Sequence, residues 1–194
     1  MLSMPEHSSE KILSAYRVGR FPMADPETGK IGWYSPDARG IVPLDAFHVP
    51  RTLRQAMKRF VVTADRAFES VIDRCAARVP TWISKEVRDA YVELFRRGNA
   101  HSVESWVGND LAGGLYGVHI GGAFMAESMF HRRTDGSKVA LVALVERLRR
   151  RGFVLCDIQM VTSHTARFGA IEISRWEYQQ RLEAAVALPV TWGD

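Results

Sequence analysis

The segment from residue 101 to residue 118 constrains the fold of this chain most strongly. Two strand-like runs, His101–Val107 and Leu111–Val118, flank the turn Gly108-Asn109-Asp110. Glycine and asparagine tolerate the backbone conformations that tight hairpin turns require, so the segment predicts a β-hairpin. A two-stranded hairpin is marginally stable alone and needs further strands or helices to cover it. The chain must therefore build a sheet around this hairpin.

The residues after the hairpin predict the next layers. Residues 122–130 are typical of a further strand, and Phe153–Met160 of another. Between them lies a predicted helix, whose apolar stripe consists of Val139, Leu141, Val142, Val145 and Leu148. We expect Asp135 or Ser137 to cap the N-terminus of this helix and Gly152 to end it.

The remaining segments add helices on both sides of the hairpin. Residue spacing predicts helices over 9–17 (with Ser8 or Ser9 as N-cap), 50–59, 67–75, 87–95 and 162–168. A last helix begins at Ser174, with Glu177 three residues later in the capping-box pattern. Residues 60–63 are strand-like, and the turn-rich segment 21–37 predicts a binding loop or a small subdomain. This order predicts an α+β fold with helices packed against one sheet.

Composition limits the class of protein. The 194 residues carry a net charge of +4, no apolar run approaches the ~18 residues of a membrane span, and Cys75 and Cys156 form no C-x-x-C pair. We therefore expect a reduced, cytoplasmic protein without membrane contact. Three basic clusters fit either a phosphate-contacting surface or solvated helix faces: Arg51, Arg54, Lys58 and Arg59; Arg132, Arg133 and Lys138; and Arg147, Arg149, Arg150 and Arg151.

The sequence indicates neither a metal site nor a nucleotide site. The six histidines form no H-E-x-x-H motif and no cluster with zinc-ligand spacing. No glycine-rich phosphate loop opens a helix, so the pyrophosphate site of an acyl-coenzyme A transferase is not evident. We expect no cofactor and no metal.

The strand around Cys156 carries the best catalytic candidates. Side chains alternate across a strand, so Asp157 and Gln159 should share one face and Cys156 the other. Two polar groups on one face predict either a cavity wall or a satisfied buried hydrogen-bond network. The same geometry argues against Cys156 as a nucleophile, because it faces away from the polar pair.

Glu127 is a further candidate. It lies in the apolar strand predicted over residues 122–130, and alternation places Met125 and Met129 on its own face. A lone carboxylate in such a strand is costly to bury, so it is expected to have a partner or a catalytic function.

An ordered set of segments from about residue 15 to residue 182 carries a family resemblance. The segments are Ala15-Tyr16-Arg17, Phe21-Pro22, Trp33-Tyr34-Ser35-Pro36-Asp37, Phe47-His48-Val49-Pro50-Arg51, Thr81-Trp82-Ile83, Gly98-Asn99-Ala100-His101-Ser102-Val103-Glu104, Gly113-Gly114-Leu115-Tyr116-Gly117-Val118, Glu127-Ser128-Met129-Phe130, Ser137-Lys138-Val139-Ala140-Leu141 and Asp157-Ile158-Gln159. Each segment is weak alone, but together they resemble the leucyl/phenylalanyl-tRNA–protein transferase family.

The resemblance implies a GNAT-like acyltransferase fold, which the order of elements alone leaves as one option among several. It implies a small N-terminal subdomain over residues 1–36, shorter than in longer family members, and a GNAT-like catalytic domain over residues 37–194. Two positions depart from the family pattern. Met23 stands where the family has a second aromatic residue after Phe-Pro, and Tyr34 replaces one of its paired tryptophans.

The resemblance also implies an activity. Leu or Phe, and less readily Met, would move from aminoacyl-tRNA to a protein whose first residue is Arg or Lys, which marks that protein for degradation. The tRNA would bind through its 3′ end and acceptor stem. The acceptor amine would attack the ester directly, with no covalent enzyme intermediate, because the ester is already activated. A monomer is expected, since nothing in the sequence marks an obligate interface.

Residue roles follow from the same resemblance. Asp157 and Gln159 would position the attacking amine, with Asp157 assisting proton removal, and Glu127 would hold an amine near the ester. Trp82 and Tyr91 would contact the tRNA 3′ end and the substrate. Some residues that could equally pack in the hydrophobic core would form the apolar pocket for the transferred side chain: Leu115, Phe124, Met129, Leu144 and Leu148.

Two rival interpretations remain. A conventional acyl-coenzyme A transferase would need the pyrophosphate loop that the sequence lacks. A tRNA-binding module without transferase activity would explain the basic clusters, but it would not explain Glu127, Asp157 and Gln159 in apolar strands.

Overall fold

The α+β class is confirmed by the computed structural model, which describes residues 8–24, 28, 30–79 and 81–193. The part of the expected N-terminal subdomain on residues 1–7, 25–27 and 29 lies outside the described residues. Among the described residues, a seven-stranded sheet has the order β4-β5-β6-β7-β8-β3-β9. Its strands are β3 (Ala38–Ile41), β4 (Val61–Ala64), β5 (Ala100–Val107), β6 (Asp110–Ile120), β7 (Ala123–His131), β8 (Leu155–Gln159) and β9 (Ile171–Ser174).

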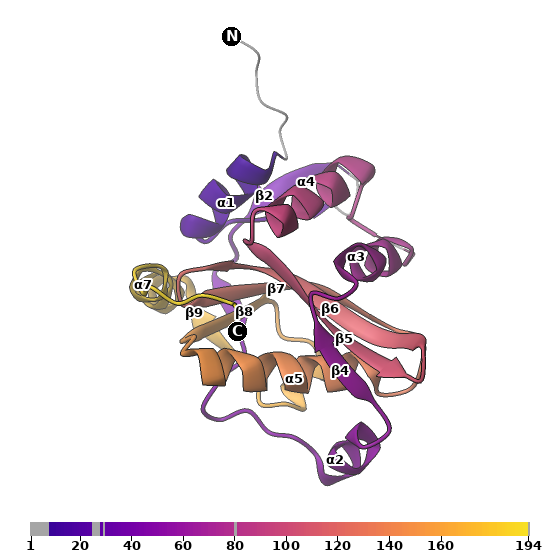
Figure 1. The fold of residues 1–194 in the computed structure, drawn as a ribbon. Helices are drawn as coiled ribbons and strands as arrows, with labels where there is room; N and C mark the ends of the chain where they lie inside the picture. Colours follow the sequence, from indigo (N-terminus) through magenta and orange to yellow (C-terminus); the bar gives the residue numbers. More distant parts are fainter. Residues whose placement is uncertain (1–7, 25–27, 29, 80, 194) are drawn as a thin grey trace.

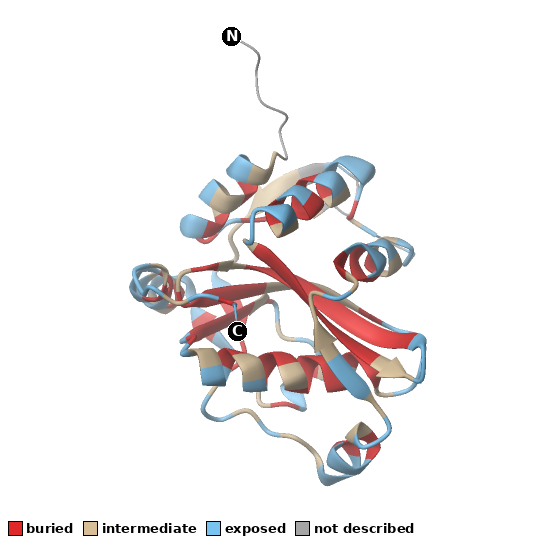
Figure 2. Cartoon of the chain, in the orientation of Figure 1, coloured by how far each residue is buried: buried red, intermediate tan, exposed pale blue. Residues whose placement is uncertain are grey.

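Helices cover both faces of this sheet (Figure 1). One face carries α1 (Ser9–Arg17), α3 (Phe68–Ala76), α4 (Lys85–Arg96) and α7 (Arg175–Val186). The other carries α5 (Gly136–Arg151), with α2 (Arg51–Met57) against it and the short α6 (Ser163–Ala166) nearby. The central strands and the sheet-facing side of α5 are buried (Figure 2). The sheet therefore separates two apolar cores, a first core under α3, α4 and α7 and a second core under α5.

The predicted hairpin is confirmed as β5 and β6, which pair along their length. The turn-rich segment proves more regular than expected, since it forms a two-stranded antiparallel sheet of β1 (Phe21–Ala24) and β2 (Ile31–Tyr34). The short strands β3 and β9 were not predicted. Both contain only four residues, and β3 reaches its place between β8 and β9 by long-range pairing.

Helix ends agree with the predictions at some positions and differ at α5. The hydroxyls of Ser8 and Ser174 cap α1 and α7, and Gly152 ends α5 with a left-handed φ of 81°. Asp135 occupies the N-cap position of α5 but makes no side-chain cap bond, and Ser137 lies inside the helix. The prediction that the side chain of Asp135 or Ser137 caps α5 is therefore wrong. No helix within the described ranges is long and apolar enough to cross a membrane.

A β-bulge in the β6–β7 ladder places Glu127. Tyr116 pairs with Ser128, and the next residue, Gly117, pairs with Ala126, so Glu127 has no partner on β6. A bulge inserts one residue and breaks the alternation of side chains between the faces.

The bulge changes which methionine shares a face with Glu127. Met125 lies in the first core, on the same side as Tyr91, the hydrogen-bond partner of Glu127. Met129 packs against the second core instead. The expectation that Met129 lies on the face of Glu127 is therefore wrong, because strict alternation does not hold across the extra residue.

The parallel strands β7 and β8 diverge in the middle of the sheet. Their pairing runs only from Ala123 and Leu155 to Met125 and Asp157. β7 then continues to residue 131, whereas β8 ends at Gln159, where a φ of 59° turns the chain. The sheet thus loses its hydrogen-bonded ladder between these two strands just before the bulge in β7.

Gly117→Ala is expected to destabilise the protein. A Cβ at this position would overlap the Met125 carbonyl and come within 2.5 Å of the Phe124 ring. Overpacking of this kind should lower the free energy of unfolding by about 1–3 kcal/mol, measured by urea denaturation. Gly193→Ala is the control, because its added carbon would have 4.0 Å to the nearest atom. An unchanged unfolding midpoint for Gly117→Ala would show that β7 can shift to make room.

Candidate functional site

A cavity of about 1000 Å³ opens where β7 and β8 diverge. Residues 126–132 line it from β7 and the turn after it, and residues 158–160 line it from the end of β8. Cys75 and Trp82 contribute from the side of the first core, and Leu115 and Leu141 from the side of the second. Side chains from both faces of the sheet therefore meet in this one space.

Glu127 is a half-buried carboxylate on the cavity wall. Its Oε2 accepts a hydrogen bond from the Tyr91 hydroxyl at 3.0 Å, and its Oε1 accepts one from the Gln159 amide at 3.1 Å. Burial disfavours the charged form and raises the pKa of Glu127 to about 7; the nearby Asp157 carboxylate acts in the same direction. A carboxyl group with this pKa can exchange a proton near neutral pH.

Gln159 completes a polar pair with Glu127 at the cavity. It is 8% exposed and adopts a left-handed backbone conformation, which is uncommon for a residue with a side chain. Its backbone N–H donates to Asp157 Oδ1 at 2.8 Å, and this bond fixes the turn. Among the described residues, the side-chain amide oxygen has no hydrogen-bond donor. The sequence did not predict this contact between Gln159 and Glu127.

Asp157 lies behind this pair and does not line the cavity. It is 0% exposed and forms a bidentate ion pair with Arg39, at 2.8 Å from Nε and 2.5 Å from Nη2. Tyr178 also donates to Asp157, from its hydroxyl at 2.8 Å. Both carboxylate oxygens are thus hydrogen-bonded within the protein. The expectation that Asp157 assists proton removal stays a prediction, and the structure places its carboxylate in a buried network behind the cavity.

Arg39 is a site residue that the sequence did not reveal. Its guanidinium lies 4.5 Å from the ring centroids of both Phe21 and Tyr178, and it donates to the Gly19 carbonyl at 3.0 Å. The residue is 1% exposed. Its only sequence signal was a lone arginine between small residues in a segment with no recognisable period. Its partner Asp157 is 118 residues away in the chain.

The two aromatic candidates occupy different places. Trp82 lines the cavity, where its ring meets the Tyr91 ring edge to face at a centroid distance of 6.3 Å. Tyr91 is fully buried and does not line the cavity. It bonds Glu127 and, at 2.7 Å, the hydroxyl of Tyr16. Tyr91 therefore holds Glu127 from behind the cavity wall, and the substrate contact that the resemblance implied stays a prediction.

The expected apolar pocket is only partly on the cavity surface. Leu115 and Met129 line the cavity. Three other expected members lie in the second core without lining it: Phe124, Leu144 and Leu148. Further apolar residues do line it, and sequence reasoning did not assign them to the pocket; Leu141 and Ile158 are among them. The pocket wall is thus thinner than expected, with a second layer of apolar side chains behind it.

Neither cysteine is a nucleophile in this structure. Cys156 faces the second core, away from Asp157, as alternation predicted, and burial raises the pKa of its thiol. Cys75 lines the cavity, but burial raises its pKa to about 12. The thiolate is the reactive form of cysteine, and neither residue reaches it near neutral pH.

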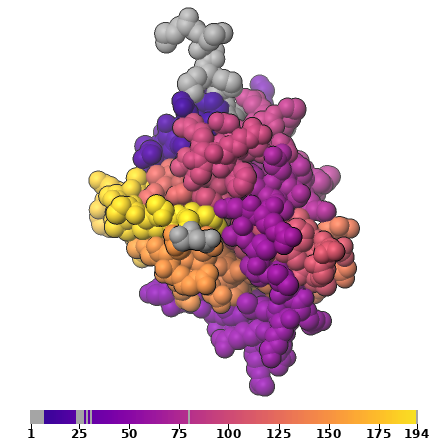
Figure 3. Space-filling model, in the orientation of Figure 1, coloured from indigo at the N-terminus to yellow at the C-terminus, as the bar shows by residue number. Residues whose placement is uncertain are grey.

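The three basic clusters differ in their surroundings. The cluster on α2 and just after it, residues 51–59, is exposed to solvent. In the cluster at the end of α5, Arg147 donates to the Trp192 carbonyl at 3.0 Å, and its guanidinium lies 4.7 Å from the Trp192 ring centroid. These contacts hold the C-terminal segment, which crosses the surface in yellow in Figure 3. The α5 cluster therefore has a structural role.

The cavity itself carries more positive than negative side chains. Its lining contains four cations, Arg74, Arg78, Arg132 and Lys138, and two carboxylates, Glu127 and Asp135. This balance favours a ligand with negative charge.

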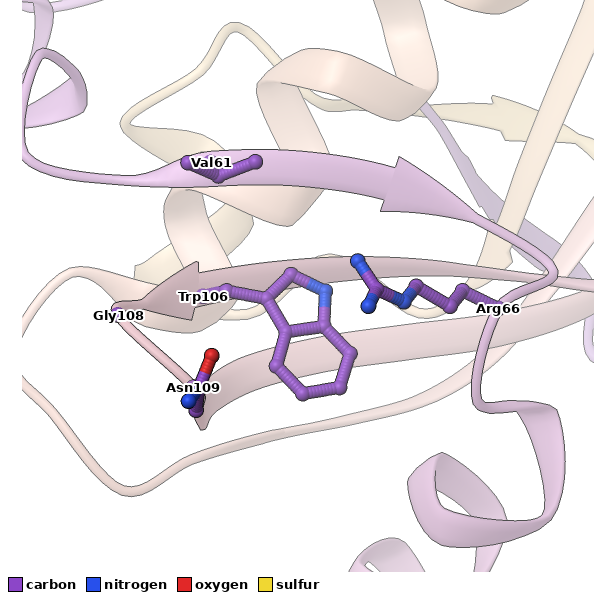
Figure 4. Close-up of a pocket in the computed structure, with 5 residues that line it drawn as sticks. All are labelled: Val61, Arg66, Trp106, Gly108 and Asn109. Carbon is purple, nitrogen blue, oxygen red and sulfur yellow. The ribbon is translucent and has the colours of Figure 1, made fainter.

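A second, smaller cavity of about 290 Å³ lies at the tip of the β5–β6 hairpin (Figure 4). Val61, Arg66, Trp106, Gly108 and Asn109 line it, and the Arg66 guanidinium lies 5.5 Å from the Trp106 ring centroid. None of these five lining residues carries a carboxylate, imidazole or thiol, so they supply no acid or base. Among the described residues, no group of three or more His, Cys, Asp or Glu side chains could hold a metal ion.

Solved structures similar to this fold include two acetyltransferases. One is a ribosomal-protein-alanine N-acetyltransferase from Brucella melitensis biovar Abortus 2308, with a TM-score of 0.42 and 12% identity, covering 56% of this chain and 86% of that one. The other is an aminoglycoside acetyltransferase from an uncultured soil metagenomic sample, with a TM-score of 0.37 and 14% identity, covering 58% and 86%. Likeness at this level says nothing about activity.

Sequence comparison is more specific. Residues 41–183 match the family model described as leucyl/phenylalanyl-tRNA protein transferase, and residues 7–37 match the model of its N-terminal domain. The leucyl/phenylalanyl-tRNA–protein transferase of Salinibacter ruber is 50% identical over 97% of this chain and 85% of that protein. The one from Gloeobacter violaceus is 50% identical over 93% and 94%. The chain therefore belongs to the leucyl/phenylalanyl-tRNA protein transferase family.

Proposed function

We propose that this protein transfers leucine or phenylalanine, and less readily methionine, from aminoacyl-tRNA to the N-terminal arginine or lysine of an acceptor protein. Family membership supports aminoacyl transfer from tRNA to protein. One observation carries the assignment of the site: a single cavity joins the Glu127–Gln159 pair to an apolar wall. An aminoacyl ester has a matching apolar side chain beside a polar reacting carbonyl.

Charge and aromatic surface suit the donor. The cationic lining of the cavity and the exposed cluster on α2 would contact phosphates of the 3′ end and the acceptor stem. Trp82 offers a ring on the cavity wall against which an unpaired base could stack. The transferred side chain would lie against the wall that contains Leu115, Leu141 and Met129.

The reaction needs one proton transfer and no covalent enzyme intermediate. The acceptor α-amine attacks the ester carbonyl, a C–N bond forms, and the C–O bond to the tRNA ribose breaks. The amine loses a proton, and the departing ribose oxygen gains one. Glu127, with a pKa of about 7, is placed to take the first proton and return the second. The free amide oxygen of Gln159 would accept a hydrogen bond from the amine and orient it.

Asp157 acts through Gln159 in this scheme. It accepts the Gln159 backbone N–H and thereby holds the left-handed turn that presents the amide to the cavity. Arg39 in turn fixes the position of the Asp157 carboxylate through the bidentate pair. Both are positioning residues.

Selection of a basic first residue would use the two carboxylates of the cavity lining, Glu127 and Asp135. The same proposal includes that the enzyme is cytoplasmic and monomeric and that its product is marked for N-degron proteolysis. The alternative, a tRNA-binding module without transferase activity, would leave the Glu127–Gln159 pair without a function.

Transfer of radiolabelled leucine from Leu-tRNA to a protein that begins with arginine tests this proposal. An otherwise identical protein that begins with alanine is the control. We expect label on the first protein and background on the second. Binding of Leu-tRNA without transfer to either acceptor would contradict the proposal and support the tRNA-binding module.

Glu127→Gln is expected to lower turnover by at least about 100-fold, the lower range for loss of a general base. The wild-type rate should rise with pH through two steps, one at the Glu127 pKa of about 7 and one at the acceptor amine pKa of about 8. The variant should keep only the amine step. A variant profile that retains both steps would show that another group titrates.

The same substitution should increase stability at high pH. The pKa of Glu127 is raised on folding, so the folded state binds more protons than the unfolded state between pH 4.5 and about 7. Stability is therefore lost as pH rises through this window. Glu127→Gln avoids that loss, so its Tm should exceed the wild-type Tm at pH 8 by more than at pH 5. A lower Tm at pH 8 would contradict the burial of the charge.

Met129→Ala is expected to shift donor preference toward phenylalanine. The change widens the apolar wall and leaves a leucine side chain poorly packed, so the Phe:Leu ratio of kcat/KM should rise about 10-fold. Met57→Ala is the matched control, because Met57 packs against the same core without lining the cavity. A ratio that changes equally in both variants would place the pocket elsewhere.

A further inference from the structure

The smaller cavity at the tip of the β5–β6 hairpin, the tip cavity, contains an indole ring held in one orientation. The Trp106 Nε1–H donates to the Thr63 hydroxyl oxygen at 2.8 Å, and that hydroxyl donates to Glu104 Oε2 at 2.5 Å. Glu104 is 0% exposed and also accepts hydrogen bonds from the Ser102 hydroxyl and the Ala67 backbone N–H. The transfer reaction does not use this buried network, which fixes the ring on the wall of the tip cavity.

Arg66 supplies a positive charge beside this ring. Its guanidinium points toward the indole (Figure 4) and lies 5.5 Å from the ring centroid. Within the described part of the chain, Arg66 pairs with no carboxylate. The carboxylates close to it in the sequence or at the hairpin turn have other partners: Asp65 contacts His101, Asp110 pairs with Arg133, and Glu69 and Asp73 pair with Arg88. The charge of Arg66 is therefore available to an anion.

These features match the chemistry of a nucleotide. A base offers a π face to the indole, a phosphate offers negative charge to Arg66, and the polar edge of the base can bond the Asn109 carboxamide, which both donates and accepts. The volume of about 290 Å³ lies at the lower end for small-ligand sites, which measure roughly 300–1,000 Å³. The tip cavity therefore suits a single base.

Cations connect the tip cavity with the larger cavity between β7 and β8. Helix α3 begins two residues after Arg66, and Arg74 near its end and Arg78 just after it line the larger cavity. The nine residues of this helix span about 14 Å. On the other side, Val61 of the tip cavity follows Arg59, the last residue of the exposed cluster on α2, by two positions. A strand of RNA could follow these charges, whereas a free nucleotide would use Arg66 alone.

We propose that the tip cavity binds one nucleotide of a single-stranded RNA, with its base stacked on Trp106 and its phosphate at Arg66. In the reaction, this nucleotide is an unpaired one upstream of the 3′-terminal adenosine of the tRNA. The identity of the RNA rests on the proposed function. The site itself does not, because its ring and its cation are present whatever the enzyme transfers.

Titration with adenosine 5′-monophosphate tests the site without any transfer reaction. In NMR spectra of the full chain, the Trp106 indole N–H signal and the Asn109 side-chain amide signals should shift in a saturable way. Trp106→Phe identifies the first signal among those of the five tryptophans. Arg66→Gln should weaken the affinity about tenfold, because it removes a charge-assisted contact to the phosphate.

Two controls belong to this titration. Arg96→Gln should leave the affinity unchanged, because Arg96 is exposed and lines neither cavity. Adenosine, which has no phosphate, should bind wild type and Arg66→Gln equally. A Trp106 signal that does not move or does not saturate would overturn the site, and so would an unchanged affinity in Arg66→Gln.

Kinetics with two donors test whether the nucleotide belongs to the tRNA. Trp106→Leu and Arg66→Gln should each raise the KM of Leu-tRNA about tenfold and leave kcat unchanged, because stacking and a phosphate contact are lost in binding. The KM of leucyl-adenosine should stay the same in both variants, since this donor has no upstream nucleotide. An equal rise for both donors would show a structural effect on the larger cavity and overturn the proposal.

The two experiments separate the possible failures. Saturable binding of adenosine 5′-monophosphate with an unchanged KM for Leu-tRNA would make the tip cavity a site for free nucleotides and overturn its assignment to RNA. Absence of transfer from both donors would contradict the proposed function, while the titration would still decide whether Trp106 and Arg66 bind a nucleotide.

Discussion

The buried ion pair of Arg39 and Asp157 organises the site. Removing two charges from water costs several kcal/mol each, and such a pair is tolerated only when its geometry is good and its remaining groups are bonded. Here the guanidinium lies between the Phe21 and Tyr178 rings and also reaches the Gly19 carbonyl. The pair therefore joins the N-terminal segment, β3, β8 and α7 at one point. Asp157 Oδ1 also accepts the Gln159 backbone N–H and so holds the turn at Gln159. The network therefore ends at the cavity.

Two backbone irregularities place the reacting groups, and both lie where β7 and β8 diverge. The bulge at Glu127 adds a residue to β7, and the left-handed conformation of Gln159 ends β8. Irregular backbone of this kind costs free energy and persists where surrounding contacts determine it. The raised pKa of Glu127 adds a further cost above neutral pH. The site thus combines several features that weaken the fold and suit proton transfer.

The sequence predicted the regular parts of this fold because their periods are visible. The β5–β6 hairpin, the long helix α5 and its glycine end follow from alternation, helical spacing and Gly152. The four-residue strands β3 and β9 have too few residues to show a period. Alternation also failed at Met129, because the bulge is set by pairing with β6. The buried ion pair of Asp157 was not predicted for a similar reason: its partner Arg39 is distant in sequence, and only tertiary structure brings them together.

The N-terminal segment is coupled to the chemistry although it lies at the edge of the fold. Tyr16 of α1 bonds Tyr91, and Tyr91 bonds Glu127, so one end of the carboxylate's hydrogen-bond network lies in the first helix. The Gly19 carbonyl receives Arg39, which fixes Asp157 and through it Gln159. Both members of the reacting pair are therefore supported from residues 16–19. A change in the packing of α1 would reach Glu127 and Gln159 by two separate routes, which is a physical reason for the N-terminal segment and the sheet to act as one unit.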